Sequence, residues 1–194
     1  MYFPNQGLTL GFHGCDSTVV EKVISKTENL NHSTAAHEWL GDGIYFWKYS
    51  QMRAFEYAEE LKLKPRKNGP LIVTPAVLGA VLDLKNCLDL TTREGLDLLK
   101  TGYQILYESY KILGKEMPKN LGTDPAGISL RRVLDCAVIN NLNKELKAFD
   151  SIRGVFWEGD ELYPGAGFRE KNHIQICVRN QNCILGYFHP RDEV

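Results

Sequence analysis

Short apolar stretches with the composition of β-strands occur at both ends of the chain, on either side of a long helical region. The strand candidates before residue 92 are 8–12, 44–47 and 71–84, and those after residue 148 are 151–159, 173–180 and 183–190. Because strands at the two ends enclose helices, we expect an α+β fold. The 194 residues suit one domain, 1–194, in which residues 92–148 form a helical insertion. Within residues 71–84 we expect the strand to be interrupted near Pro75 and Gly79.

Helices are expected where apolar residues recur at helical spacing, behind a polar residue that can cap them. The first would follow Asp16, Ser17 or Thr18 and bury Val19, Val20, Val23 and Ile24. A second is expected from about Ser50 to Leu61. The insertion would hold two helices separated by PKNLGTDPAG. One would pack through Leu99, Tyr103, Leu106, Tyr107 and Tyr110, and the other through Leu130, Val133, Leu134, Val138 and Leu142.

The stretch GDGIYFWKYSQMRAFEYA places four apolar or aromatic residues directly behind a glycine turn. In a strand, Ile44 and Phe46 would share one face, and Tyr45 and Trp47 the other. The segment can therefore be core on one face and the wall of a pocket on the other.

Charge and cysteine content exclude several classes of protein. A formal net charge of -1 and a pI near 6.5 leave no electrostatic basis for nonspecific nucleic-acid binding, although an enzyme acting at one atom of a nucleic acid remains open. The five cysteines are widely spaced without a CxxC pair, so we expect neither a disulfide framework nor a metal site. MYFPNQGLTLGF lacks a basic leader, and no apolar run approaches 18 residues, so we expect a soluble, cytoplasmic protein without membrane contact.

The pair His13-Gly14 is a candidate binding element, because it follows the first expected strand. Glycine permits a ligand to approach the backbone closely and leaves its N–H and C=O free to bind an amide. A lone histidine at a strand end is also a common structural residue, and both interpretations stay open.

Four segments resemble poly(ADP-ribose) polymerase catalytic domains and their diphtheria-toxin-like relatives. They are FHGCDSTVVEKVI, GDGIYFWKYSQMRAFEYA, VLGAVLDLKNCLDL and KNHIQICVRN, in the order that the family has them. The resemblance covers residues 8–90 and 152–188 and leaves 92–148 without a counterpart. It implies an ADP-ribosyltransferase-like fold of split antiparallel β-sheets with flanking helices, and NAD as co-substrate.

The resemblance also implies roles for individual residues. His13 would bond the adenosine-side ribose, the Gly14 backbone would hold the nicotinamide carboxamide, and Tyr45 would line the nicotinamide pocket. The family's stacking tyrosine matches Tyr57 if one residue is inserted, and the position falls on Glu56 without an insertion. Such a site would hold the nicotinamide, fix the ribose hydroxyls and stabilise positive charge at the anomeric carbon.

The last segment departs from the family, whose catalytic glutamate opens that strand. Here the candidates are His173 and Gln175, which point to one face of a strand, while Ile174, Ile176 and Val178 point to the other. Gln175 could bond a ribose hydroxyl, but without a fixed charge it would lose on the order of 10²–10³ in rate.

A replacement carboxylate could come from the preceding loop, which contacts the acceptor in the family. The candidates are Glu158, Asp160, Glu161 and Glu170, and Tyr163 and Phe168 could touch an acceptor. The alternative for each carboxylate is a solvated loop position.

These observations predict a mono-ADP-ribosyltransferase that moves ADP-ribose from NAD to a protein or nucleic-acid acceptor and releases nicotinamide. One alternative is a catalytically inactive module that binds NAD or ADP-ribose, and another is an NAD glycohydrolase toxin. An RNA 2′-phosphotransferase fits less well, because the chain is not basic. A regulatory partner or antitoxin is an open possibility.

Overall fold

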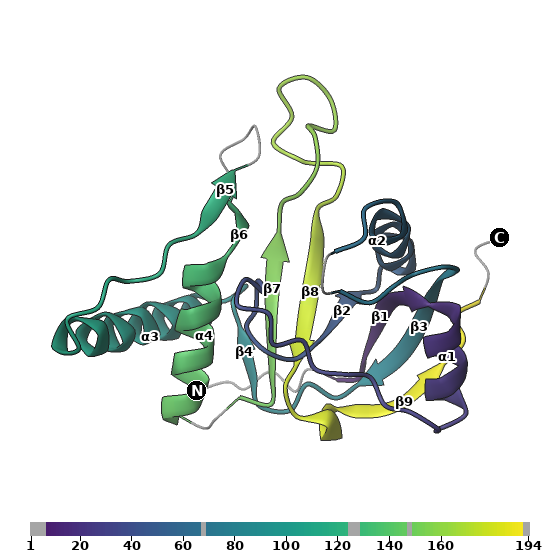
Figure 1. Cartoon of the computed structure of the whole chain (residues 1–194), viewed down its shortest axis with the longest axis horizontal. Coiled ribbons are helices and arrows are strands. Elements are labelled where there is room, and N and C mark those ends of the chain that lie inside the picture. Colours follow the sequence, from purple (N-terminus) through teal and green to yellow (C-terminus); the bar gives the residue numbers. More distant parts are fainter. Residues whose placement is uncertain (1–6, 67–68, 124–128, 147–148, 192–194) are drawn as a thin grey trace.

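The computed structural model describes residues 7–66, 69–123, 129–146 and 149–191. Within these ranges the protein has an α+β fold, with four α-helices and a mixed, mostly antiparallel sheet of seven strands (Figure 1). The strand order β4-β7-β8-β2-β1-β3-β9 interleaves strands from both ends of the chain. The α+β class predicted from the sequence is thereby confirmed.

The elements have the following bounds. The strands of the large sheet are β1 (Thr9–Asp16), β2 (Ile44–Lys48), β3 (Pro75–Leu82), β4 (Cys87–Asp89), β7 (Ser151–Phe156), β8 (His173–Val178) and β9 (Ile184–Phe188). The helices are α1 (Ser17–Ile24), α2 (Gln51–Leu63), α3 (Arg93–Ile112) and α4 (Val133–Leu146), with a 3-10 turn, η1 (Gln181–Cys183), before β9. None of the helices in the described ranges is long and apolar enough to cross a membrane. Residues 1–6, part of the N-terminal stretch assessed above, lie outside the described residues.

The sheet is continuous, whereas the resemblance predicts split antiparallel sheets. Hydrogen bonds join all seven strands, and β4 runs parallel to β7. The junction between β1 and β2 is narrow, because only Gly11 with Lys48 and Phe12 with Trp47 are paired there. By comparison, eight residue pairs join β1 to β3. The predicted separation is therefore wrong, and the two parts of the sheet meet at a junction of two residue pairs.

Two predicted strand ends are also wrong. β1 does not end before His13 but continues to Asp16, so that His13 and Gly14 lie inside a strand. β3 begins at Pro75 and continues through Gly79 without a break. The pairing of the two strands explains both differences, since every residue from 9 to 16 pairs with a residue of β3. It extends β1 beyond residue 12 and carries β3 through Gly79, although residues 71–74 of the predicted strand lie outside β3.

Helices α1 and α2 cover opposite faces of the sheet. Val20 and Val23 of α1 pack in the core cluster that contains Phe46, whereas Ala54 of α2 packs against Trp47. Because neighbouring strand residues point to opposite faces, Phe46 and Trp47 mark the two sides. The predicted division of residues 44–47 into a core face and a second face is confirmed.

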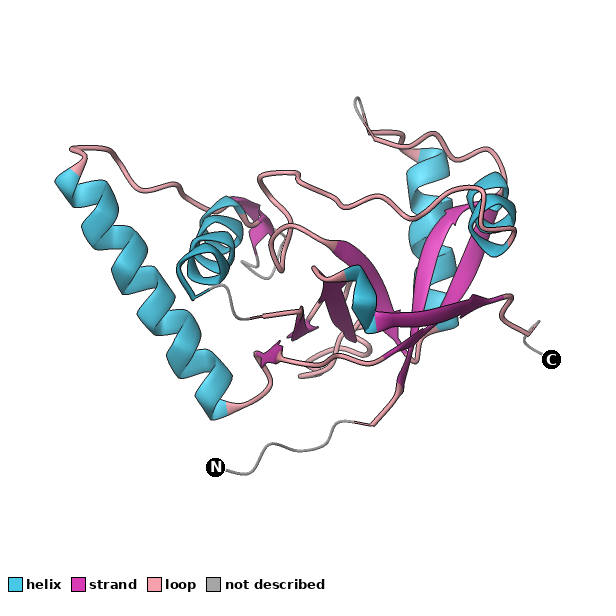
Figure 2. Cartoon of the chain, turned by 90° about the horizontal axis from the view of Figure 1, so that it is seen from below, coloured by secondary structure: helices cyan, strands magenta, loops and turns pink. Residues whose placement is uncertain are grey.

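The insertion contains the two predicted helices, joined by a small ribbon of β5 (Leu121–Thr123) and β6 (Ser129–Arg131). Figure 2 shows α3 on the flank of the molecule beside α4. Of the predicted packing face of α3, Leu106 is buried and Leu99 packs on a core cluster, as expected, whereas the prediction is wrong for Tyr103 and Tyr107, which are 41% and 45% exposed. Gly102 faces Leu142 of α4 instead, and this close approach moves the tyrosines outward. Leu130 belongs to β6 rather than to a helix. Of the predicted PKNLGTDPAG connector, residues 124–127 lie outside the described residues.

Asp16 joins the end of β1 to the start of α1. Its Oδ1 accepts hydrogen bonds from the Thr18 backbone and side chain, and its Oδ2 accepts from the N–H groups of Val73 and Thr74 at 2.7 and 2.8 Å. Of the three predicted caps, Asp16 is the one that the structure uses. These hydrogen bonds hold the pKa of the Asp16 carboxyl well below its ordinary value.

Asp16→Asn is expected to lower the free energy of unfolding by about 2 kcal/mol at pH 7, because one side of an amide cannot accept from N–H groups. The depressed pKa means that the carboxylate stabilises the fold above its unfolded pKa of about 4, and that this contribution is lost as the pH falls toward the folded-state pKa. Urea unfolding at pH 7 and pH 3 measures both effects. Asp83→Asn is the control, since Asp83 caps one exposed N–H, that of Lys85. An equal loss of unfolding free energy in the two variants would contradict the stabilising role assigned to the Asp16 hydrogen bonds.

Candidate functional site

The three catalytic candidates lie together on the face of the sheet that carries α2. On β8, His173 pairs with Phe156 of β7, and Gln175 pairs with Trp47 of β2. Glu158 follows β7, and its Oε2 lies 3.9 Å from His173 Nδ1. The predicted alternation of β8 holds, because Ile176 and Val178 are buried in the core of the opposite face.

His173 is buried and its two ring nitrogens differ. Nδ1 lies 2.7 Å from the Lys171 carbonyl oxygen, so Nδ1 carries a hydrogen and donates it. Nε2 then presents a lone pair, and it has no hydrogen-bond partner among the described residues. Burial holds the pKa of His173 below its ordinary value. The side chain is therefore neutral at pH 7 and can accept a proton or a hydrogen bond at Nε2.

Aromatic rings surround His173. Trp47 stacks at a tilt on Tyr57 of α2, with ring centroids 4.8 Å apart, and lies 6.3 Å from the His173 ring. On the other side, the Phe156 ring lies 5.8 Å from His173. The Arg132 guanidinium covers Phe156 at 5.0 Å. His173 is thus packed among flat aromatic surfaces, of the kind on which a planar ring can stack.

Arg53 of α2 connects the helix to the loop between β7 and β8. Its side chain is 9% exposed; Nη1 donates to Glu56 Oε2 at 2.5 Å, and Nη2 donates to Glu158 Oε2 at 3.3 Å. Lys171, at the far end of the loop, pairs with Glu60 of the same helix. Arg53 therefore fixes Glu158 beside His173.

Arg53→Met is expected to lower the free energy of unfolding by about 2 kcal/mol, because it leaves carboxylates without their buried cation; their partial exposure keeps the loss moderate. Urea unfolding measures it, and hydrogen exchange should become faster in residues 157–172. Arg93→Met is the matched control, since the Arg93–Asp97 pair is exposed. The role assigned to Arg53 fails if the two variants lose the same stability.

Buried polar atoms without a hydrogen-bond partner concentrate at this site. Among the described residues six such side-chain atoms occur, and five belong to this cluster or its immediate neighbour in the chain: Trp47 Nε1, Arg53 Nε, Arg132 Nε, Asn172 Oδ1 and His173 Nε2. An unpaired buried group costs about 1–3 kcal/mol, so several in one place mark a position where water or a polar ligand would supply hydrogen bonds. Across the described ranges, no three His, Cys, Asp or Glu side chains converge as metal ligands.

His13 lies on the opposite face from this cluster. Its Nδ1 is 2.8 Å from the Tyr45 carbonyl oxygen, and its ring is 5.9 Å from Phe46. Burial holds the pKa of His13 below its ordinary value. The imidazole thus bridges β1 and β2 just beyond their last residue pair.

Gly14 has a structural role in packing, besides the ligand-binding role predicted for its backbone. A Cβ at this position would lie 1.9 Å from the Ala54 carbonyl oxygen, so α2 can approach β1 only over glycine. The Leu10 carbonyl accepts a hydrogen bond from the N–H of Tyr49, the residue after β2, so the peptide groups of Leu10 point toward β2. Alternation along β1 then directs the N–H and C=O of Gly14 toward β2 as well, beyond the paired residues of the junction.

Tyr45 and Tyr57 have different surroundings. The Tyr45 hydroxyl donates to the Gly41 carbonyl at 2.6 Å and accepts from the Leu40 N–H at 2.9 Å, which holds the preceding turn. Burial raises the pKa of Tyr45 strongly. Tyr57 is half-buried against Trp47 and belongs to the cluster. The structure therefore joins Tyr57, but not the Tyr45 hydroxyl, to the catalytic candidates.

The loop after β7 is internally hydrogen-bonded and projects beyond the sheet (Figure 1). The Lys171 N–H bonds the Glu158 carbonyl, and the Leu162 N–H bonds the Phe168 carbonyl. Tyr163 and Phe168 are exposed near its tip. Of the four loop carboxylates proposed from the sequence, Glu158 is the one that contacts Arg53 and approaches His173, while the exposed Asp160, Glu161 and Glu170 lie farther along the loop.

Sequence reasoning missed Arg53, Arg132 and Phe156 as members of the site. Arg53 and Arg132 resemble ordinary surface arginines in the sequence, because their burial depends on contacts with distant segments. Phe156 carried a usable signal, since it lies at alternating spacing from Ile152 on the expected strand.

Comparison with models of known protein families gives no match, and no solved structure matches the chain. The chain is similar to an uncharacterized protein of Methanocaldococcus jannaschii. The two are 29% identical over 197 aligned positions, which span 89% of this chain and 83% of the archaeal protein.

Proposed function

We propose that this protein binds NAD at the cluster around Trp47 and His173 and transfers ADP-ribose from it, with release of nicotinamide. The observation that carries the proposal is the group of unpartnered buried polar atoms between aromatic rings, next to Gln175 and Glu158. A nicotinamide ring matches the flat walls, and ribose hydroxyls and phosphates match the donors and acceptors.

The chemistry assigned to the site follows from its charges. When the bond between nicotinamide and ribose breaks, nicotinamide leaves with the bonding electron pair and positive charge develops on the ribose. Glu158 supplies the negative charge that β8 lacks, and Gln175 bonds a ribose hydroxyl. The acceptor then attacks the anomeric carbon and gives its proton to the neutral Nε2 of His173.

Two features of the fold support an ADP-ribosyltransferase-like arrangement. The sheet is narrowest between β1 and β2, with two residue pairs, and His13-Gly14 lies at this junction. The peptide groups of Gly14 point into the same junction, where they can meet a carboxamide. The junction lies next to Trp47, which links it to the cluster.

A second candidate function is NAD or ADP-ribose binding without turnover. It is favoured by the Arg53–Glu158 ion pair, which neutralises the carboxylate that would stabilise the transition state. In this case the cluster would recognise the nucleotide, and the exposed loop would contact a partner.

The test is incubation of the purified protein with NAD labelled in the adenylate part, with and without cell lysate proteins and RNA. The proposal predicts free nicotinamide together with labelled protein or RNA. Nicotinamide without labelled macromolecule identifies a glycohydrolase instead. Calorimetric binding of ADP-ribose without nicotinamide release identifies the inactive binder. The proposal is overturned if the protein shows no ADP-ribose binding and no nicotinamide release.

A further inference from the structure

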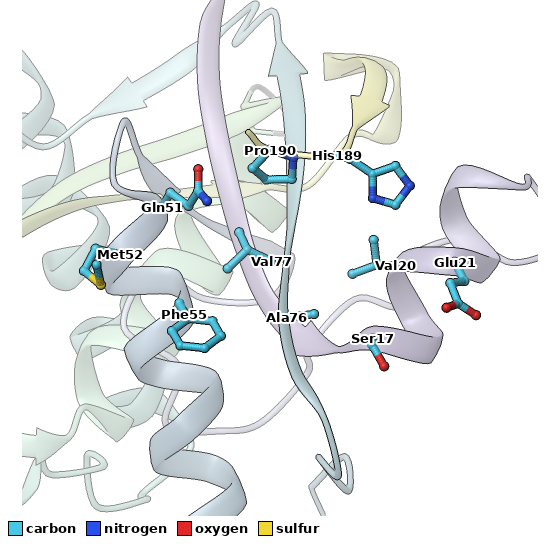
Figure 3. Close-up of a pocket in the computed structure, with 10 residues that line it drawn as sticks. All are labelled: Ser17, Val20, Glu21, Gln51, Met52, Phe55, Ala76, Val77, His189 and Pro190. Atoms are coloured by element: carbon cyan, nitrogen blue, oxygen red, sulfur yellow. The ribbon is translucent and has the colours of Figure 1, made fainter. Parts of the chain in front are cut away.

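A pocket of about 550 Å³ lies on the other side of β1 from the β1–β2 junction, at the outer edge of the sheet. Figure 3 shows how α2 contributes Met52 and Phe55 on one side, α1 contributes Val20 and Glu21 on the other, and β3 passes between them. His189 and Pro190, just after β9, close the pocket at one end.

The edge of β3 is only partly covered by β9. Their pairing ends where Gly79 meets Phe188. Two residues further on, Pro190 would come opposite Val77, and proline has no N–H to donate to a neighbouring strand. The chain turns toward α2 instead, where Gln51 Nε2 bonds the Arg191 carbonyl at 3.1 Å.

Val77 therefore presents an uncovered peptide edge. Alternation directs the peptide groups of Ala80 toward its partner Gly11 in β1, and those of Gly79 and Val77 toward the side of β9. An edge with unpaired N–H and C=O groups can accept another strand.

The two sides of the pocket differ in chemistry. The α2 side presents the apolar Met52 and Phe55 beside Gln51, whose amide nitrogen bonds the Arg191 carbonyl, and Met52 is 50% exposed. The α1 side carries the carboxylate of Glu21, which forms no ion pair in the described part of the chain. The adjacent cation, Lys22, pairs with Glu28 instead. Successive side chains of an added strand would enter these two sides in alternation.

We propose that this edge binds an extended peptide of a partner protein, which pairs with Val77 and alternates apolar and basic side chains. The apolar residues contact Met52 and Phe55, and the basic residue next to them pairs with Glu21. This site is independent of NAD, so its failure and that of the proposed function are distinguishable.

The probe is a fluorescein-labelled, amidated heptapeptide of the sequence Ser-Val-Lys-Val-Lys-Val-Ser, titrated with the full chain and followed by fluorescence anisotropy. Saturable binding is expected, and Glu21→Lys should weaken it at least tenfold. The same peptide N-methylated at its central valine should also bind at least tenfold more weakly, because it cannot donate to the Val77 carbonyl. A peptide with aspartate in place of lysine should also bind at least tenfold more weakly, because its carboxylates would face the carboxylate of Glu21.

Val77→Pro tests the protein side of the contact. The proline removes the outward N–H and also replaces the Val77 side chain, which packs partly buried against Phe12, Trp47 and Ala54, so the melting temperature of the variant is measured first. The folded variant should lose the peptide, and Glu21→Lys, at an exposed position, keeps the test available if Val77→Pro does not fold. No binding of the lysine peptide, or equal binding of the N-methylated one, overturns the proposal. Sedimentation that shows a dimer abolished by Val77→Pro also overturns it, in favour of a second copy at the edge.

Discussion

Glu158→Gln is expected to lower the rate of nicotinamide release from NAD by about 10²- to 10³-fold, because it removes the charge that the proposed chemistry places beside the developing cation. The effect should fall on kcat more than on KM, since the charge acts in the transition state. The amide keeps the shape of the side chain, and Arg53 retains its contact with Glu56. Product chromatography over a range of NAD concentrations separates the two constants.

Glu161→Gln is the matched control for Glu158→Gln. Glu161 lies in the same loop, but its carboxylate is exposed and accepts from the Gly165 N–H, which an amide oxygen can replace. Its rate should stay within about twofold of the native rate, in keeping with the small effect of surface substitutions. Equal rates for the two variants would remove Glu158 from the proposed chemistry while leaving NAD binding to be measured separately.

Gly14→Ala is expected to cost at least about 3 kcal/mol of unfolding free energy, a large part of the stability of an ordinary domain. The added Cβ would lie 1.9 Å from the Ala54 carbonyl oxygen, and no side-chain rotation can relieve a contact with backbone. Helix α2 would have to move away from β1, and the Trp47–Tyr57 contact would open with it. Urea unfolding measures the loss.

Gly186→Ala serves as the comparison for Gly14→Ala. Gly186 also lies in a strand, β9, and a Cβ there would meet no atom within 4 Å. We expect its unfolding midpoint to stay within the range of ordinary surface substitutions, about 0.5 kcal/mol. If Gly14→Ala unfolds at the same urea concentration as Gly186→Ala, α2 does not pack on β1 as described.

Much of the fold could be predicted because it depends on local patterns. Alternation identified both faces of residues 44–47 and of β8, and helical spacing behind three possible caps, Asp16, Ser17 and Thr18, identified α1. The ends of β1 and β3 could not be predicted in the same way. The extension of β1 and the continuity of β3 through Gly79 depend on the pairing of these two strands, and the sequence near His13-Gly14 contains signals of a strand end that this pairing overrides.

The tyrosine stripe of α3 shows a different limit. Spacing identified a face of α3 correctly as a candidate for packing, but Gly102 permits an approach to Leu142 that rotates the contact away from Tyr103 and Tyr107.

The candidate site was predicted in part. His173, Gln175, Glu158 and Tyr57 are close together because alternation and helical position placed them on one side of the sheet. The prediction could not include Arg53, whose burial requires carboxylates from α2 and from a loop more than 100 residues away. It also could not show that the Tyr45 hydroxyl is engaged by the turn at Leu40 and Gly41.

The most direct measurement for the proposed NAD site is a crystal of the protein soaked with a non-hydrolysable NAD analogue. The proposal predicts a nicotinamide ring against Tyr57 and Trp47, its ribose near Gln175 and Glu158, and hydrogen bonds to Nε2 of His173 or Nε1 of Trp47. An analogue bound elsewhere, or crystals that bind none at millimolar concentration, would contradict the assignment.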